Sequence, residues 1–71
     1  MKYAIYCKNS GEYLHSNKEV RWGYKVNKVL FKPRLFSHKF RAQNWIEKND
    51  VIGDLIVVKV KQVIGYEIVD I

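Results

Sequence analysis

The chain has 71 residues, 48% of them hydrophobic, and a formal net charge of +6 at pH 7. This length fits a single domain spanning residues 1–71, and the apolar fraction is too high for an intrinsically disordered chain. Every apolar stretch is shorter than the roughly 18 residues that a membrane-spanning helix needs, so we expect no membrane partner.

The first elements in chain order are two strands. Residues 2–8 are rich in Tyr and Ile, as is typical of a strand, and residues 12–15 continue as a second, short strand. Gly11 lies between them in a stretch of turn-forming residues and can adopt a positive φ. The start of the chain therefore predicts a hairpin, and it lacks the apolar run and cleavage site of a signal peptide.

The third expected strand, residues 20–26, alternates with a period of two. Trp22 and Tyr24 share one face, whereas Arg21 and Lys25 point to the opposite one. Two alternatives remain open for the rings: they face the core, or they lie exposed beside a basic surface. The first interpretation is the simpler one, because the alternation separates the rings from the cations.

Residues 37–49 form the one segment with helical periodicity. Ala42, Trp45 and Ile46 recur at i, i+3 and i+4, so they share a face that should organise the core. Ser37 is the expected N-cap, because its hydroxyl can accept hydrogen bonds from N–H groups of the first turn. The periodicity therefore predicts a helix with one apolar stripe, laid on a sheet.

Two more strands are expected after the helix. Residues 55–61 are apolar on both faces in their first half, as in a central strand covered by a helix. Residues 62–65 should form a turn, and residues 66–71 a last strand. The helix stripe is expected to pack on even-numbered residues of the first of these strands, namely Ile56, Val58 and Val60.

The resulting order is β-β-β-α-β-β, which places the chain in the α+β class. We expect a small antiparallel sheet of about four to five strands with one helix, about residues 37–49, packed on one face. A single core of this size usually yields only about 3–5 kcal/mol of stability. Pairing into a homodimer would supplement this stability, so a homodimer is compatible with the sequence.

The positive charge is concentrated in residues 18–41. That segment holds eight bases and one acid, whereas the rest of the chain holds five bases and six acids. Such an imbalance points to an acidic macromolecule as partner. The cations and rings of this region form the predicted binding patch, which comprises Arg21, Trp22, Tyr24, Lys25, Lys28, Lys32, Arg34, Lys39, Phe40 and Arg41.

The polar residues offer little that would support catalysis or metal binding. His15 and His38 are far apart in the sequence, and the single Cys7 cannot form an internal disulfide. Asp50 and Asp54 flank a predicted loop, where acids commonly stabilise turns. We therefore expect a non-enzymatic protein with no cofactor and no metal, and the lone cysteine favours a reducing, cytoplasmic compartment.

One layout runs along most of the chain: a first strand, a glycine turn, a Phe-Ser step into a helix with an Ala-x-x-Trp-Ile stripe, and a Val-rich strand. The residues concerned are Tyr3-Ala4-Ile5, Gly11-Glu12-Tyr13-Leu14, Leu35-Phe36-Ser37, Ala42, Trp45 and Ile46. This layout resembles small accessory proteins encoded by bacteriophages. The resemblance implies a common role of that group, which is to bind and inhibit a host enzyme or defence complex, sometimes by occupying a nucleic-acid site.

Two functional hypotheses follow. The first is a small non-enzymatic binding protein, encoded by a phage, that modulates or inhibits a host protein or defence complex through its basic and aromatic surface. The alternative is a protein that binds DNA or RNA through the basic segment 18–41. In that case the cations would contact phosphates and exposed rings would stack on bases.

Overall fold

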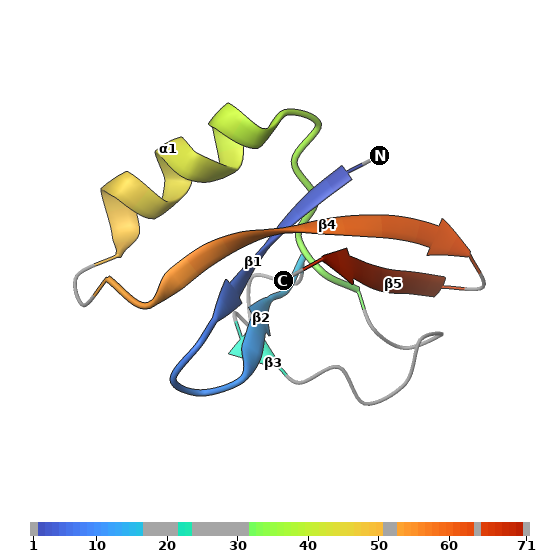
Figure 1. The fold of residues 1–71 in the computed structure, drawn as a ribbon, viewed down its shortest axis with the longest axis horizontal. Helices are drawn as coiled ribbons and strands as arrows, with labels where there is room; N and C mark the ends of the chain where they lie inside the picture. Colours follow the sequence, from blue (N-terminus) through green and yellow to red (C-terminus); the bar gives the residue numbers. More distant parts are fainter. Residues whose placement is uncertain (1, 17–21, 24–31, 51–52, 64, 71) are drawn as a thin grey trace.

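The computed structural model describes residues 2–16, 22–23, 32–50, 53–63 and 65–70, and within these ranges the fold consists of five strands and one helix. The elements are β1 (Lys2–Cys7), β2 (Glu12–Leu14), β3 (Trp22–Gly23), α1 (Lys39–Asn49), β4 (Leu55–Val63) and β5 (Gly65–Asp70). The strands form one antiparallel sheet in the order β3-β2-β1-β4-β5, with α1 packed against it (Figure 1). The predicted α+β architecture is confirmed. Within the described ranges, no helix is long and apolar enough to cross a membrane.

The pairing of β1 with β4 is the longest continuous contact in the sheet. It extends from Lys2 opposite Val60 to Cys7 opposite Leu55, so every residue of β1 has a partner in β4. Tyr and Ile in β1 and the Val-rich stretch of β4 are residues that favour a pleated, half-buried surface. On its other edge β1 pairs with β2 over only two positions, at the hairpin end.

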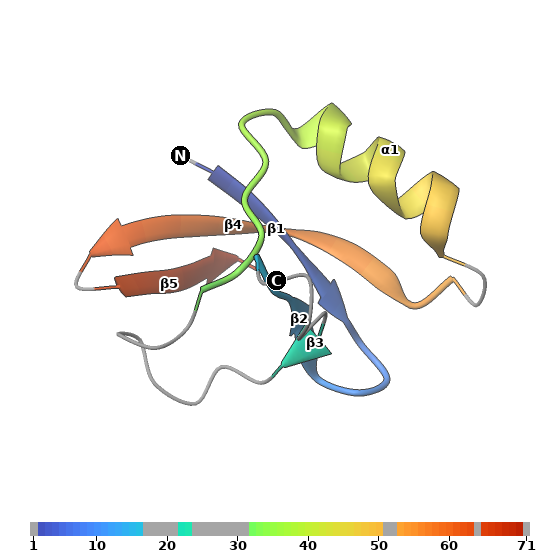
Figure 2. The same cartoon turned by 180° about the vertical axis from the view of Figure 1, so that it is seen from behind.

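Residues 32–36 occupy the edge of β1 that β2 leaves open. The N–H groups of Tyr3 and Phe36 each donate to the other residue's carbonyl, at 2.9 and 2.8 Å. Two residues earlier, the Arg34 N–H donates to the Leu14 carbonyl at the end of β2, at 2.8 Å. The segment is thus fixed to both strands before it leads into α1, and Figure 2 shows it as the green trace crossing the sheet.

The sheet is apolar on both faces, and each face carries its own cluster. The helix-side cluster comprises Ile5, Leu14, Ala42 and Ile46, with Tyr3, Trp22, Phe36, Trp45, Leu55 and Val57 packed around them. The far-side cluster comprises Ala4, Tyr13, Val58 and Val60, with Tyr6, Leu35, Ile56, Tyr66 and Ile68 packed around them. Burial in the far-side cluster, and then the neighbouring Tyr6, raise the pKa of Tyr13 above its usual value.

The predicted packing of the helix on Ile56, Val58 and Val60 is wrong. Leu55 and Val57 lie in the helix-side cluster, and the even-numbered residues belong to the other face. The first half of β4 is apolar at every position, so its pattern offers two equivalent faces and cannot show which one the helix covers. Because successive side chains of a strand point to opposite faces, an error of one residue moves all three predicted contacts to the wrong face together.

The predicted N-cap at Ser37 is also wrong. The N-cap is His38, whose backbone is extended and whose side chain makes no capping hydrogen bond within the described helix. Lys2 Nζ in β1 instead donates to Ser37 Oγ at 3.2 Å, so the hydroxyl is engaged by a residue distant in sequence. At the other end of α1, the Asp50 carboxylate accepts hydrogen bonds from the N–H groups of Gly53 and Leu55, at 2.9 and 3.3 Å.

The β4–β5 connection is tighter than the predicted turn over residues 62–65. Strand β4 continues through Gln62 to Val63, and β5 begins at Gly65, which is the register partner of Val63. Gly65 has a φ of 91°, a conformation that glycine adopts without steric cost. The positive φ of Gly65 therefore allows the strands to stay paired almost to the reversal of the chain.

Gly23 in β3 lies directly against the ring of His15. A Cβ atom added at Gly23 would lie 2.6 Å from His15 Nε2, closer than ordinary van der Waals contact. We expect Gly23→Ala to destabilise the fold by roughly 1–3 kcal/mol in urea denaturation, the usual range for overpacking. In a His15→Ala background most of this loss should disappear, because the ring is gone.

Gly53 supplies the matched control. Its φ is 86°, and a Cβ atom there would meet nothing within 4 Å. Gly53→Ala should therefore cost about 1–2 kcal/mol through backbone strain alone, to the same extent with and without His15→Ala. Equal losses for Gly23→Ala in the two backgrounds would contradict the proposed contact.

Candidate binding surface at the start of the helix

The structure describes six of the ten residues of the predicted patch. The exposed or partly exposed members that it describes are Trp22, Lys32, Arg34, Lys39, Phe40 and Arg41. The other four, Arg21, Tyr24, Lys25 and Lys28, lie outside the described residues. Arg34, Lys39, Phe40 and Arg41 come together where residues 32–36 lead into the first turn of α1.

Trp22 is placed apart from these residues. Its ring is half-buried in the helix-side cluster, edge-on to the Trp45 ring with the two centroids 6.3 Å apart. Such edge-to-face pairs add about 0.5–1.5 kcal/mol beyond the area they bury. For Trp22, therefore, the interpretation that the ring faces the core is confirmed, and Tyr24 lies outside the described residues.

Arg34, Arg41 and Lys48 border a groove between the 34–38 segment and α1, which we call the basic groove. Its volume is about 590 Å³. Its lining comprises Arg34, Leu35, Phe36, Ser37, His38, Arg41, Asn44, Trp45 and Lys48. The cations are exposed and the apolar residues are half-buried, and none of the described lining residues is acidic.

Both walls of the basic groove are held by the fold. On the helix, Arg41 and Lys48 are two turns apart with Asn44 and Trp45 between them, so all four lie along one side of α1. On the opposite wall, the backbone of Arg34 is hydrogen-bonded to β2 and that of Phe36 to β1. Strand pairing and helix periodicity thus fix the backbone positions from which these charges project.

The two arginines lie over aromatic rings. Cζ of Arg34 is 5.3 Å from the centroid of the Phe36 ring, and Cζ of Arg41 is 5.9 Å from that of Phe40. A guanidinium over an aromatic face is attracted to it by about 0.5–1 kcal/mol at exposed sites. The planar guanidinium also carries a fork of N–H groups that suits recognition of carboxylate or phosphate.

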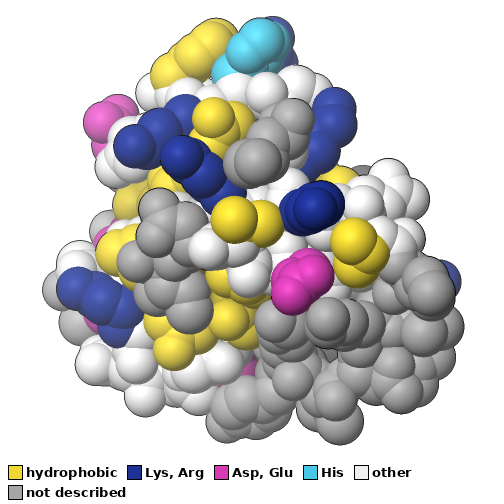
Figure 3. Space-filling view, turned by 45° about the vertical axis from the view of Figure 1, so that its right-hand side comes forward, with side chains coloured by type: hydrophobic (Ala, Val, Ile, Leu, Met, Phe, Trp, Pro, Cys, Tyr) yellow, Lys and Arg dark blue, Asp and Glu magenta, His cyan; other side chains and the backbone are white. Residues whose placement is uncertain are grey.

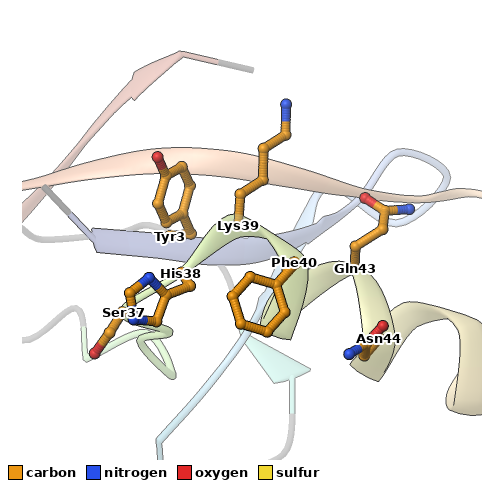
Figure 4. A pocket seen from close by; sticks show the side chains of 7 residues that line it. All are labelled: Tyr3, Ser37, His38, Lys39, Phe40, Gln43 and Asn44. Carbon is orange, nitrogen blue, oxygen red and sulfur yellow. The ribbon is translucent and has the colours of Figure 1, made fainter.

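A second hollow lies beside the basic groove, and we call it the ring pocket. Its volume is about 680 Å³. It is lined by Tyr3, Ser37, His38, Lys39, Phe40, Gln43 and Asn44. The Phe40 ring is 60% exposed and is stacked on His38, with centroids 5.4 Å apart and an angle of 22° between the planes. In Figure 4, Phe40 lies between His38 and the carboxamides of Gln43 and Asn44.

The charges at the start of α1 are unfavourable for the helix itself. The first turn carries Lys39 and Arg41 and no acid. The N-terminal end of a helix dipole favours negative groups, by about 0.3–1 kcal/mol each. Residues that lower the stability of a helix in this way are expected where the surface has a function, such as binding.

On the face shown in Figure 3, Lys and Arg side chains gather around hydrophobic ones in the upper part of the molecule, beside a histidine.

A smaller hollow of about 370 Å³ near the other end of α1 has the opposite character, with Glu12, Asp50 and Asp54 in its lining. There the thiol of Cys7 donates to Asp54 Oδ2 at 3.3 Å. Among the described residues, no group of three or more His, Cys, Asp or Glu could hold a metal ion.

Several residues of this surface are absent from the predicted patch. Lys48 follows Arg41 by seven positions and Asn44 follows Phe40 by four, so helix periodicity alone could have added them. Tyr3 could not be found in this way, because only the pairing of β1 with Phe36 brings it to the start of α1.

Comparison with protein-family models, with curated proteins and with solved structures finds no match to this chain.

Proposed function

We propose that this chain is a small non-enzymatic binding protein whose basic groove holds an anionic segment of an acidic macromolecule. The observation that carries the proposal is the convergence of Arg34, Arg41 and Lys48 on a groove with no acid among its described lining residues. Positive charges gathered in this way raise the local concentration of anions and steer an acidic partner to the groove.

The spacing of the cations favours a chain of charges over a single small anion. Lys48 follows Arg41 by seven residues, which corresponds to about 10 Å along the helix axis at 1.5 Å per residue. The half-buried Phe36 and Trp45 between the cations add apolar contact area. A ligand with regularly repeated negative groups and an apolar part fits both features.

Acidic polypeptides and nucleic acids both carry such repeated charges. The resemblance to phage accessory proteins supports a host protein or defence complex as the partner, met in the host cytoplasm. Exposed Arg and aromatic residues are the types that dominate protein–protein hot spots, which is compatible with that partner. Nucleic acid is the second candidate, and the observation that favours it is the ring pocket beside the groove.

Salt dependence of binding tests the proposal. Fluorescence anisotropy should detect micromolar binding of a ten-residue poly-Glu peptide or a ten-nucleotide thymidine oligomer at 50 mM salt. With three phosphate contacts and a slope of about −0.7 per contact, the affinity for the oligomer should fall about twentyfold by 200 mM salt. Failure of both polyanions to bind at low salt would contradict the proposal, and a neutral Gly-Ser peptide is the control.

A capture experiment distinguishes the two candidate partners. The tagged protein is incubated with bacterial lysate, with and without nuclease, and the retained proteins are identified by mass spectrometry. Direct binding to a host protein predicts that the same protein is retained after nuclease treatment. If nuclease removes every co-purifying protein, the host-protein partner is refuted and nucleic acid carries the association.

A further inference from the structure

The ring pocket has a different chemical character from the basic groove. Aromatic rings and carboxamides dominate its lining, with one cation, Lys39, and no acid among the residues the structure describes there. Its volume of about 680 Å³ lies within the range of about 300–1,000 Å³ found for sites that take small organic groups. An anion alone would leave most of this lining without contact.

Phe40 has no part in the core that would explain its position. It is 60% exposed, whereas Ala42 and Ile46 on the opposite side of α1 are buried in the helix-side cluster. Its ring is nearly parallel to that of His38, with an angle of 22° between them. The exposed part of the Phe40 ring, flanked by His38 and by the Arg41 guanidinium, offers an aromatic surface of the kind on which nucleic-acid bases stack.

Two carboxamides lie next to this aromatic surface. Gln43 and Asn44 follow Phe40 by three and four positions, so all three project from the same side of α1 (Figure 4). Both side chains are exposed, and each offers a donor and an acceptor. Proteins that read unpaired bases combine stacking on a ring with such hydrogen bonds to the base edges.

From these features we propose that the ring pocket is a nucleobase site and that the acidic partner is a single-stranded nucleic acid. One base stacks on the exposed part of the Phe40 ring, and the neighbouring phosphates lie in the basic groove. The inference rests on the proposed function, because the pocket and the groove share Ser37, His38 and Asn44 and so form one continuous surface. An acidic polypeptide matches the charge, but its carboxylates leave the aromatic surface unused, and in a duplex the bases are already stacked.

Three probes of equal length test the nucleobase site by anisotropy: a ten-nucleotide thymidine oligomer, the corresponding abasic phosphodiester oligomer, and a ten-residue poly-Glu peptide. The thymidine oligomer should bind about tenfold more tightly than the abasic one, which is the contribution of one stacked base. Equal binding of these two would overturn the nucleobase site and leave the basic groove in place. Tightest binding of poly-Glu would also overturn it and assign the partner to acidic protein, whereas no binding of any probe would refute the proposed function itself.

Phe40→Ala is the decisive variant. It should lower the affinity for the thymidine oligomer about tenfold, to that of the abasic oligomer, while the affinity for the abasic oligomer stays unchanged. Phe40→Trp should retain the preference, because it keeps a stacking ring. Val69→Ala removes another exposed apolar side chain, 51% exposed on β5, and should change neither affinity. Equal losses for both oligomers in Phe40→Ala would show a structural role for the ring and overturn the site.

Discussion

Replacing Arg34 and Arg41 together with Glu is expected to weaken polyanion binding about a hundredfold at low salt. Each substitution turns an attraction into a repulsion, and charge pairs near a protein surface are worth about 1–4 kcal/mol at contact. The fold should persist, because both side chains are exposed and Arg34 is held through its backbone. Anisotropy with the thymidine oligomer and with poly-Glu measures the loss, and circular dichroism verifies folding.

Lys8→Glu with Lys61→Glu is the matched control for this variant. It changes the net charge by the same amount at two exposed lysines, one in the turn after β1 and one on β4. If binding depends on the basic groove, the control should lose only a few-fold in affinity through the general field of the molecule. Comparable losses in the two double variants would show that net charge alone attracts the polyanion, and the groove would then have no specific role.

Trp22→Ala is expected to destabilise the fold by roughly 2–4 kcal/mol, slightly below the usual range for a fully buried tryptophan. The ring is half-buried, packs edge-on against Trp45 and belongs to the helix-side cluster. A domain of this size has about 3–5 kcal/mol of stability in total, so much of the variant should be unfolded. Urea denaturation followed by circular dichroism measures the change.

Trp22→Phe separates packing from binding at the same position. It keeps an aromatic ring in the cluster, so the variant should fold and bind polyanions with the affinity of the parent chain. A Trp22→Phe variant with unchanged stability but much weaker binding would place the ring in the binding surface. That result would contradict the assignment of Trp22 to the core.

The elements that local sequence determines were predictable. The stripe of Ala42, Trp45 and Ile46 gives the helix, and the β-branched run of β4 gives a central strand. The face of the sheet that the helix covers could not be predicted, because residues 55–58 are apolar at every position. The packing of α1 on the paired strands selects that face, and this packing is a tertiary property.

The binding surface could be predicted only in part for a related reason. The concentration of bases in residues 18–41 pointed to Arg34, Lys39 and Arg41, and helix geometry placed Phe40 away from the apolar stripe. Tyr3 joins the ring pocket through the pairing of β1 with Phe36, and Lys2 from the same strand takes the hydroxyl expected to cap the helix. Contacts between segments more than 30 residues apart leave no periodic signal in the sequence.

The position of the ligand on the molecule tests the central claim most directly. In ¹⁵N–¹H correlation spectra, titration with the ten-nucleotide thymidine oligomer should shift the amide signals of residues 34–48 most strongly, with Phe40 and Arg41 among the largest. The signals of Gly65–Asp70 in β5 should stay in place. Shifts centred on β5, or on the acidic hollow around Cys7 and Asp54, with residues 34–48 unperturbed, would contradict the assignment of the basic groove and ring pocket as the binding surface.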